Sequence, residues 1–241
     1  MVVSIIIAAV LAVVFIGYRV AYADKSNVNG VIAMFIKTVA SLAFIAIGFT
    51  GVLTLDHFSK GALFIIAGQV FGMIGDIVLD LKVVYQGKKE EGVYLTGGMA
   101  SFGIGHILFF VAILLYLTSS VLSLASIGIC IAVAAVAAFA IIFGGEKLMG
   151  FKFGKFTIHS ILYGFLLVFM SAVSVAGWVL YGKTNPHMPV FSIGMILFFL
   201  SDVFLTQMYF GGKPNDKTLC IINHALYYAA QICVAAFVFY M

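Results

Sequence analysis

Two aspartates occupy closely similar positions within long apolar stretches of the chain. Asp76 lies in the segment GQVFGMIGDIVLD and Asp202 in GMILFFLSDVFL; each follows a small residue and precedes an aliphatic one, with a leucine three positions later. An ionisable side chain at membrane depth is energetically costly, so such residues usually face the protein interior and carry function. The sequence therefore predicts a paired-carboxylate site inside a helical bundle.

The composition indicates an integral membrane protein of the all-α class. The chain has 241 residues, of which 64% are hydrophobic and only 9% charged. A soluble domain of this size cannot cover such a composition with a polar surface, whereas runs of about 20 apolar residues can span a bilayer. Eight transmembrane helices are predicted in a single transmembrane domain, 1–241. They cover residues 2–22, 32–55, 61–81, 92–117, 121–143, 154–181, 190–210 and 218–240.

Positive charges lie mainly in the loops on one side of the membrane. The loops after the odd-numbered spans contain or border ten lysines and arginines, against two in the other loops. Because such an excess marks cytoplasmic loops, we expect a multi-pass protein of a bacterial plasma membrane with both termini external. The net charge of +4 is a topology signal, and nothing indicates nucleic-acid binding. The ten are Arg19, Lys25, Lys82, Lys88, Lys89, Lys147, Lys152, Lys155, Lys213 and Lys217, and the two are Lys60 and Lys183.

The third and fourth spans resemble the seventh and eighth. Gly68 lies eight residues before Asp76, and Gly194 lies eight residues before Asp202. The following span contains GHILFF, with His106, in the first case and NHALYY, with His224, in the second. This pattern predicts two four-helix halves, about 1–117 and 118–241, related by internal pseudo-symmetry. Glycines spaced four residues apart also fit plain helix packing.

The remaining polar residues of the spans gather in the cytoplasmic half. Asp76 and Asp202 lie five and eight residues from the predicted cytoplasmic ends, roughly 7–12 Å deep at a rise of about 1.5 Å per residue. One polar chamber open toward the cytoplasm would contain both carboxyls, within about 10 Å of each other. Simpler roles stay open: snorkelling for Lys37, pairing of Asp80 with Lys82 or Lys37, and interior hydrogen bonding for the histidines. Also in this half are His159, Tyr163, Tyr227 and Tyr228.

Several short motifs in the same order resemble those of the YhhN-like family of integral membrane lysoplasmalogenases. The resemblance covers nearly the whole chain and implies two essential aspartates, which map to Asp76 and Asp202. The sequence departs from the family pattern at Thr38, where a proline often follows the lysine. The matching residues are Lys37, Gly75, Asp76, Leu79, Gly98, Phe102, His106, Gly194, Phe198, Ser201, Asp202, Tyr227, Tyr228 and Gln231.

The family resemblance implies cleavage of the vinyl ether of a lysophospholipid substrate drawn from membrane lipid. Protonation of the alkene gives an oxocarbenium ion, and water then yields a hemiacetal that collapses to a fatty aldehyde and a glycerophospho-base. Two carboxyls suit this reaction without a cofactor: Asp202 as the protonated acid and Asp76 as the ionised partner that stabilises the cation. Lys37 and Lys82 are candidate phosphate ligands. The supporting set is Lys37, Asp80, Lys82, His106, Ser201, His224, Tyr227, Tyr228 and Gln231.

Other functions use similar residues. A proton-coupled transporter also needs intramembrane carboxylates, but its helices are usually interrupted at the site. A metal-dependent lipid hydrolase would have to assemble its ligands across helices, since there is no HExxH spacing. An intramembrane aspartyl protease would have a Gly-x-Gly-Asp motif, where this chain has Met73-Ile74-Gly75-Asp76, and a Pro-Ala-Leu motif, which is absent from the sequence. Neither the oligomeric state nor the head-group preference is indicated.

Overall fold

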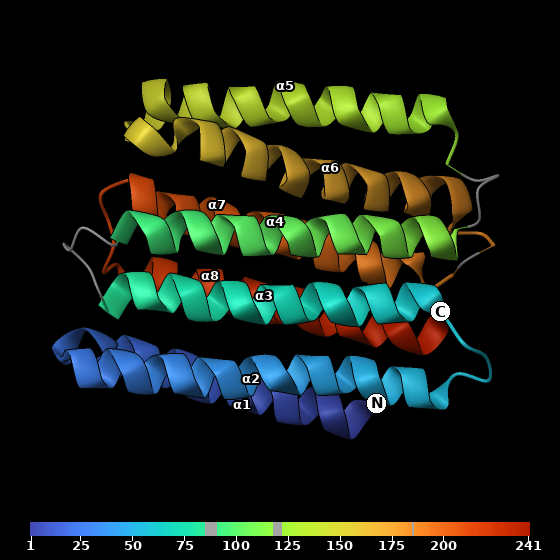
Figure 1. The fold of residues 1–241 in the computed structure, drawn as a ribbon, viewed down its shortest axis with the longest axis horizontal. Helices are drawn as coiled ribbons and strands as arrows, with labels where there is room; N and C mark the ends of the chain where they lie inside the picture. Colours follow the sequence, from blue (N-terminus) through green and yellow to red (C-terminus); the bar gives the residue numbers. More distant parts are fainter. Residues whose placement is uncertain (85–90, 118–121, 185) are drawn as a thin grey trace.

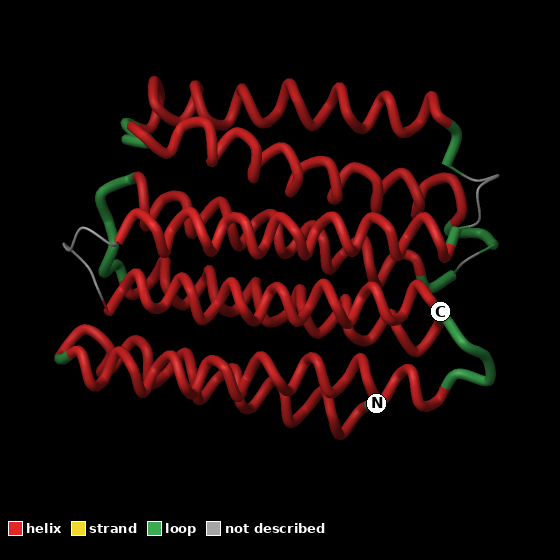
Figure 2. The backbone as a smooth tube through the Cα atoms, in the orientation of Figure 1, coloured by secondary structure: helices red, strands yellow, loops and turns green. Residues whose placement is uncertain are grey.

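The structure is a bundle of long helices. The computed structural model describes the chain except residues 85–90, 118–121 and 185 and the side chains of residues 82–84. Within that part, eight helices are long and apolar enough to cross a membrane, and Figure 2 shows helices joined by short connections, with no strand. The helices are α1 (Val2–Tyr22), α2 (Asn27–Thr54), α3 (Lys60–Val84), α4 (Glu91–Tyr116), α5 (Leu124–Met149), α6 (Thr157–Tyr181), α7 (Met188–Phe210) and α8 (Lys217–Phe237).

The predicted all-α class with eight spans is confirmed, and the differences lie at helix ends. α2 begins at Asn27 rather than at residue 32, because the Ser26 hydroxyl caps it by accepting from the Asn29 N–H at 3.2 Å. α5 runs from Leu124 to Met149 rather than over 121–143. It passes through the Gly-Gly-Glu-Lys sequence, which looks like a loop, and ends at Gly150 in the left-handed region with φ 69°.

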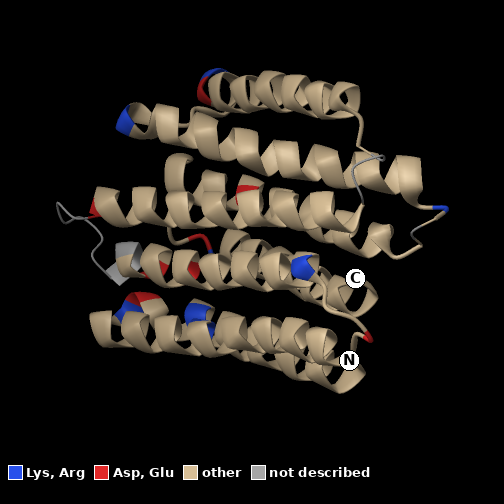
Figure 3. Ribbon diagram, turned by 45° about the vertical axis from the view of Figure 1, so that its right-hand side comes forward, with Lys and Arg blue, Asp and Glu red and all other residues tan. Residues whose placement is uncertain are grey.

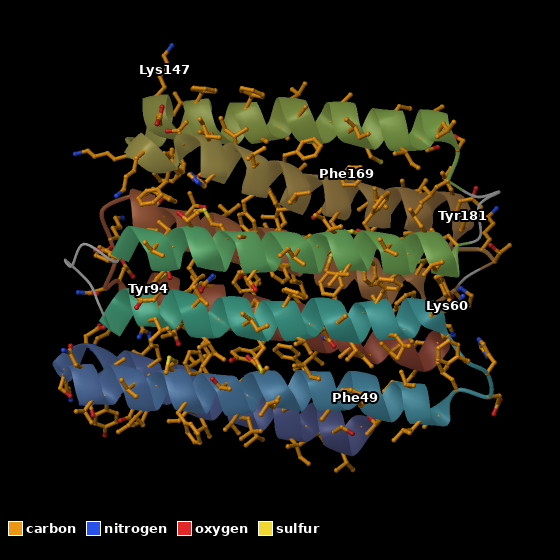
Figure 4. The ribbon with its side chains drawn as sticks, in the orientation of Figure 1. Phe49, Lys60, Tyr94, Lys147, Phe169 and Tyr181 are labelled. Atoms are coloured by element: carbon orange, nitrogen blue, oxygen red, sulfur yellow. The ribbon has the colours of Figure 1, made fainter. Side chains whose placement is uncertain are left out.

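The helices differ in how much of their surface the protein covers. In the most apolar window of α8, 61% of residues are buried, against 22% for α1 and α5. α8 therefore belongs to the centre of the bundle, and α5 lies at its edge, packed mainly on α6 (Figure 1). Large apolar side chains on the outer faces are exposed and suited to contact with lipid. One of them, Phe49 in Figure 4, is 52% exposed.

All the odd-numbered helices end at the same end of the bundle. Both termini and the α2–α3 connection lie at the opposite end (Figure 1). Charged residues concentrate at the end that carries the α1–α2, α5–α6 and α7–α8 connections (Figure 3). Lys147 lies there, whereas Lys60 and Tyr181 mark the other end (Figure 4). We call the charge-rich end the basic end; it is the end that the charge bias predicts to be cytoplasmic.

Glycines set the spacing of the helix pairs that carry the aspartates. A Cβ at Gly68 on α3 would lie 3.0 Å from the Gly105 carbonyl oxygen on α4, and a Cβ at Gly194 on α7 would lie 3.1 Å from the Ala230 carbonyl oxygen on α8. Such close approach of two backbones requires glycine. α3 therefore packs tightly on α4, and α7 on α8. The internal duplication of the two halves stays a prediction.

Candidate active site

Lys37 on α2 reaches across to two carboxyls on α3. Its Nζ lies 3.2 Å from Asp76 Oδ1 and 3.4 Å from Asp80 Oδ1. The three side chains are buried, with relative exposures of 2–5%. Lys37 therefore does not snorkel to the interface, because it bridges two aspartates that stand one helical turn apart on the facing helix. Of the alternatives for Asp80, pairing with Lys37 is the one observed.

Asp76 is held by three side chains. Besides the ion pair with Lys37, its Oδ2 accepts hydrogen bonds from the Ser41 hydroxyl at 2.8 Å and from the Tyr227 hydroxyl at 2.7 Å. Ser41 lies one turn after Lys37 on α2, so the same helix face supplies the cation and one donor. A carboxyl that receives a cation and two hydroxyl donors has the surroundings of an ionised group.

A polar ladder extends from Asp76 along α3 and α8. Gln231 Nε2 donates to the Tyr227 hydroxyl at 3.3 Å. Gln69 Nε2 donates to the Gln231 backbone carbonyl oxygen at 3.0 Å and lies 3.3 Å from the side-chain oxygen Oε1 of Gln231. The Tyr228 hydroxyl donates to the Lys37 carbonyl at 3.3 Å. These bonds fix the position of α8 beside Lys37, Asp76 and Asp80.

Asp202 on α7 has different surroundings. The Tyr163 hydroxyl on α6 donates a hydrogen bond to its Oδ2. Among the described residues no lysine, arginine or histidine forms an ion pair with it. Its neighbours on α7 include apolar Val203 and the buried Phe198 as well as Ser201 and Thr206, none of which carries a charge. A buried carboxyl without a cation has the surroundings of a protonated group.

A cavity of about 360 Å³ opens beside Asp202 between α4, α5, α6 and α7, with Leu79 of α3 also in its lining. Asp202, Tyr163 and Ser160 contribute polar groups to a lining that is otherwise mainly apolar. The Ser160 Oγ is buried and has no hydrogen-bond partner among the described residues. The lining continues to Leu148 and Met149 near the end of α5, which are 84% and 59% exposed. The cavity therefore lies in the half of the bundle next to the basic end, which we call the basic half.

We expected one cavity to contain both aspartates. This cavity contains only one of them, because its lining includes Asp202 but not Asp76. Aromatic rings stand in the region between the two. Phe198 packs against Tyr227 with ring centroids 5.4 Å apart and against Phe102 at 5.9 Å. The two carboxyls nevertheless lie close enough to interact electrostatically.

His106 joins this group of rings. Its ring lies edge-on to Phe198 at 4.8 Å and to Tyr163 at 6.1 Å between centroids. Its Nδ1 lies 2.8 Å from the Phe102 carbonyl oxygen, which can only accept, so Nδ1 carries the proton. Nε2 is then the basic nitrogen of the neutral ring, and it is buried without a partner among the described residues. His106 is thus a neutral imidazole with a free acceptor close to Tyr163.

A comparison with protein-family models matches the YhhN family over residues 32–238. The chain belongs to the YhhN family. The match runs from within α2 to Val238, which follows α8, so it includes both aspartates and the helices α3 to α8. No match was found among curated proteins or among solved structures.

The other residues that we expected at the site of this YhhN protein do not all lie together. Ser201 lies next to Asp202, whereas His224 lies against α1. Asn223 Nδ2 donates to the Ser201 carbonyl and lies 3.0 Å from its hydroxyl, which joins α7 to α8 next to Asp202. His224 bonds the Cys220 carbonyl through Nδ1 at 2.8 Å and packs against Phe15 of α1. His224 therefore faces α1. The Lys82 side chain lies outside the described residues.

Four residues near the aspartates are absent from the expected set. Ser41 and Tyr163 donate to Asp76 and Asp202, Ser160 lines the cavity, and buried Arg19 interacts electrostatically with Asp80. The four-residue spacing from Lys37 to Ser41 is a signal that places both on one helix face. Ser160 carried no such signal, because a single serine in a span is common. Among the described residues no group of three or more His, Cys, Asp or Glu side chains could hold a metal ion.

Proposed function

We propose that this YhhN protein is a membrane hydrolase that cleaves the vinyl ether bond of lysoplasmalogens. Membership of the family is consistent with that activity. The observation that carries the proposal is the asymmetry of the two carboxyls. Asp76 is paired with Lys37 and two hydroxyls, whereas Asp202 receives only the Tyr163 hydroxyl and lines an apolar cavity. One ionised and one protonated carboxyl are what an acid-catalysed reaction through a cation requires.

Asp202 is the proton donor in this mechanism. Because Tyr163 donates to Oδ2, the proton of the neutral acid resides on Oδ1. It is transferred to the alkene carbon that does not bear oxygen, which leaves an oxocarbenium ion and the Asp202 carboxylate. Water then adds to the cation and returns a proton to Asp202. The hemiacetal collapses to a fatty aldehyde and a glycerophospho-base, so that one water is consumed for each bond cleaved.

Asp76 acts through its charge rather than by contact with substrate. Lys37 and the two hydroxyl donors keep it ionised, and its electrostatic interaction with the Asp202 region favours a cation forming there. His106 does not line the cavity beside Asp202, so we assign it to packing against Tyr163 and Phe198. We assign Lys37 to holding Asp76, because its Nζ is already engaged by two carboxylates.

Exposed lysines of the α5–α6 connection are better placed than Lys37 to receive the phosphate. Lys152 lies between Phe151 and Phe153, which line the cavity next to Asp202, and Lys155 follows two residues after Phe153. Both lysines are exposed at the basic end. A lysolipid with its phosphate at this connection would place its chain along the apolar part of the cavity, with the ether linkage near Asp202.

The test is release of aldehyde by purified protein from an alkenyl lysolipid, compared with its acyl counterpart of the same chain length and head group. We expect aldehyde from the alkenyl lipid alone, with no loss in the presence of a chelator. Hydrolysis of the acyl lipid alone would contradict the proposal. Activity lost to the chelator and restored by Zn²⁺ would instead support the metal-dependent lipid hydrolase.

The alternative of a proton-coupled transporter has weaker support. Such proteins usually bind substrate where a helix is broken. Here the helices that carry the aspartates, α3 over Lys60–Val84 and α7 over Met188–Phe210, are each a single continuous α-helix. Uptake of a labelled lysolipid by vesicles without any cleavage would favour the transporter.

A further inference from the structure

A second cavity lies next to the one that Asp202 lines. It has a volume of about 590 Å³ and lies between α5, α6 and α7, farther from the basic end. The lining of both cavities includes Val168 of α6 and Phe199 of α7. The two spaces therefore meet at these two side chains. Each volume falls in the range of about 300–1,000 Å³ that is usual for small-molecule sites.

α6 runs along both cavities. Its lining residues follow one another at intervals of no more than three positions, so they form a continuous stripe that winds gradually around the helix. From Ser160 to Leu180 the stripe rises about 30 Å, which equals the usual thickness of the hydrocarbon layer. Ser160, Tyr163, Gly164 and Leu167 line the first cavity, Val168 lines both, and Ser171, Ala172, Val175, Ala176, Val179 and Leu180 line the second.

The second cavity is apolar and open toward the lipid. Two of its lining residues on α5, Ile129 and Val133, are 65% and 50% exposed on the outer surface of the bundle. On α6, Val179 is 76% exposed. α5 covers this side only partly, since 22% of its most apolar window is buried. A lipid chain can therefore enter sideways from the bilayer, between α5 and the rest of the bundle.

The polar groups of the paired cavities are concentrated at the end nearest the basic end. Asp202, Tyr163 and the unpartnered Ser160 hydroxyl lie in the first cavity, beside the lysine-bearing α5–α6 connection. The second cavity contributes only Ser126, Ser171 and Cys130 among aliphatic and aromatic side chains. A polar end followed by a stripe of mainly small and apolar residues on α6 matches a lipid with one hydrocarbon chain.

We propose that the two cavities form one channel for the single hydrocarbon chain of the substrate and that its length sets the chain-length preference. The chain passes between Val168 and Phe199 and extends past Ala172 and Ala176, while Ser160 donates a hydrogen bond to an oxygen of the glycerol part. This inference rests on the proposed function, because it takes Asp202 as the reaction centre.

A block in the second cavity tests the channel. Ala172→Phe and, separately, Ala176→Phe add a ring to walls that only the second cavity uses. We expect kcat/KM for a long-chain alkenyl lysolipid to fall at least about tenfold, with a short-chain substrate unaffected. Val136→Phe is the matched control, because Val136 is 72% exposed on α5 and lines neither cavity. An equal loss for both chain lengths, or no loss from either block, would overturn the channel.

A binding experiment separates failure of the channel from failure of the proposed reaction. A single-chain lysolipid with a photoreactive group at the end of its chain is crosslinked to the wild-type protein and mapped by mass spectrometry. We expect labels on lining residues of the second cavity in α5 and α6, and their loss in Ala172→Phe but not in Val136→Phe. Such labelling supports the channel even if no aldehyde is released. Labels confined to other faces of the bundle, or unchanged in Ala172→Phe, would overturn it.

Discussion

The two aspartates differ in the groups that surround them, and this difference gives each a distinct role. Asp76 lies against a lysine and two hydroxyl donors, so its charge is stabilised in the interior. Asp202 has one hydroxyl donor and faces an apolar cavity, so its neutral form is favoured. Like-charge interaction between the two adds to the preference for one ionised and one neutral carboxyl.

Substitution of Asp202 is expected to remove the proton donor. Asp202→Asn keeps the shape of the side chain and can still accept from Tyr163, but it cannot donate an acid proton. We expect aldehyde release to fall about 10²–10⁴-fold, with the thermal transition in detergent nearly unchanged. Asp202→Glu is the matched variant that restores a carboxyl and should recover part of the activity. Full activity in Asp202→Asn would exclude Asp202 as the acid.

Substitution of Lys37 is expected to act first on stability. Lys37→Met removes the lysine that pairs with both buried Asp76 and Asp80, and Asp80 Oδ2 has no hydrogen-bond partner among the described residues to compensate. Removing one partner of a buried ion pair typically costs about 3–5 kcal/mol, so the melting temperature should fall clearly. The double variant Lys37→Met with Asp80→Asn should recover part of that loss. A higher KM with an unchanged melting temperature would instead support phosphate binding as the role of Lys37.

At the scale of the helices, the sequence predicted nearly all of the architecture. In lipid every backbone polar group must be satisfied within its own segment, so apolar runs of sufficient length become helices. Helix ends depended on local caps such as Ser26 and Gly150, which hydrophobicity does not encode. The cavity beside Asp202 depends on how loosely α5 covers α6 and α7. Small residues alone do not reveal that spacing, and for this reason Ser160 and the separation of the two aspartates were not foreseen.

The close packing of α3 on α4 is expected to depend on Gly68. In Gly68→Ala the new methyl would lie 3.0 Å from the Gly105 carbonyl oxygen and against the Phe109 ring, so the helices must separate. We expect a loss of about 1–3 kcal/mol, measured as a lower melting temperature, and reduced activity because Asp76 lies on the same helix. Gly128→Ala on α5 is the control, since a Cβ there meets nothing within 4 Å. Equal melting temperatures for the two variants would contradict this account of the packing.

At the scale of the whole molecule, the lysine-bearing connections and the two cavities are arranged asymmetrically along the bundle. The connections that carry most lysines lie at the same end of the bundle as the exposed end of α5, whose side chains line the cavity beside Asp202. The apolar second cavity extends away from that end. If the basic end is cytoplasmic, the substrate's phosphate lies at the cytoplasmic surface and its chain points toward the membrane interior, as in a lysolipid of the inner leaflet.

This orientation predicts which connections a membrane-impermeant thiol reagent can reach from outside. In a variant whose three native cysteines are replaced, a cysteine at His57 in the α2–α3 connection should be labelled in intact cells. A cysteine at Asn215, in the α7–α8 connection, should be labelled only after the membrane is opened. Both positions are exposed, so access to the reagent depends on the side of the membrane. Labelling of Asn215→Cys but not His57→Cys in intact cells would reverse the topology and place the reaction centre in the external half.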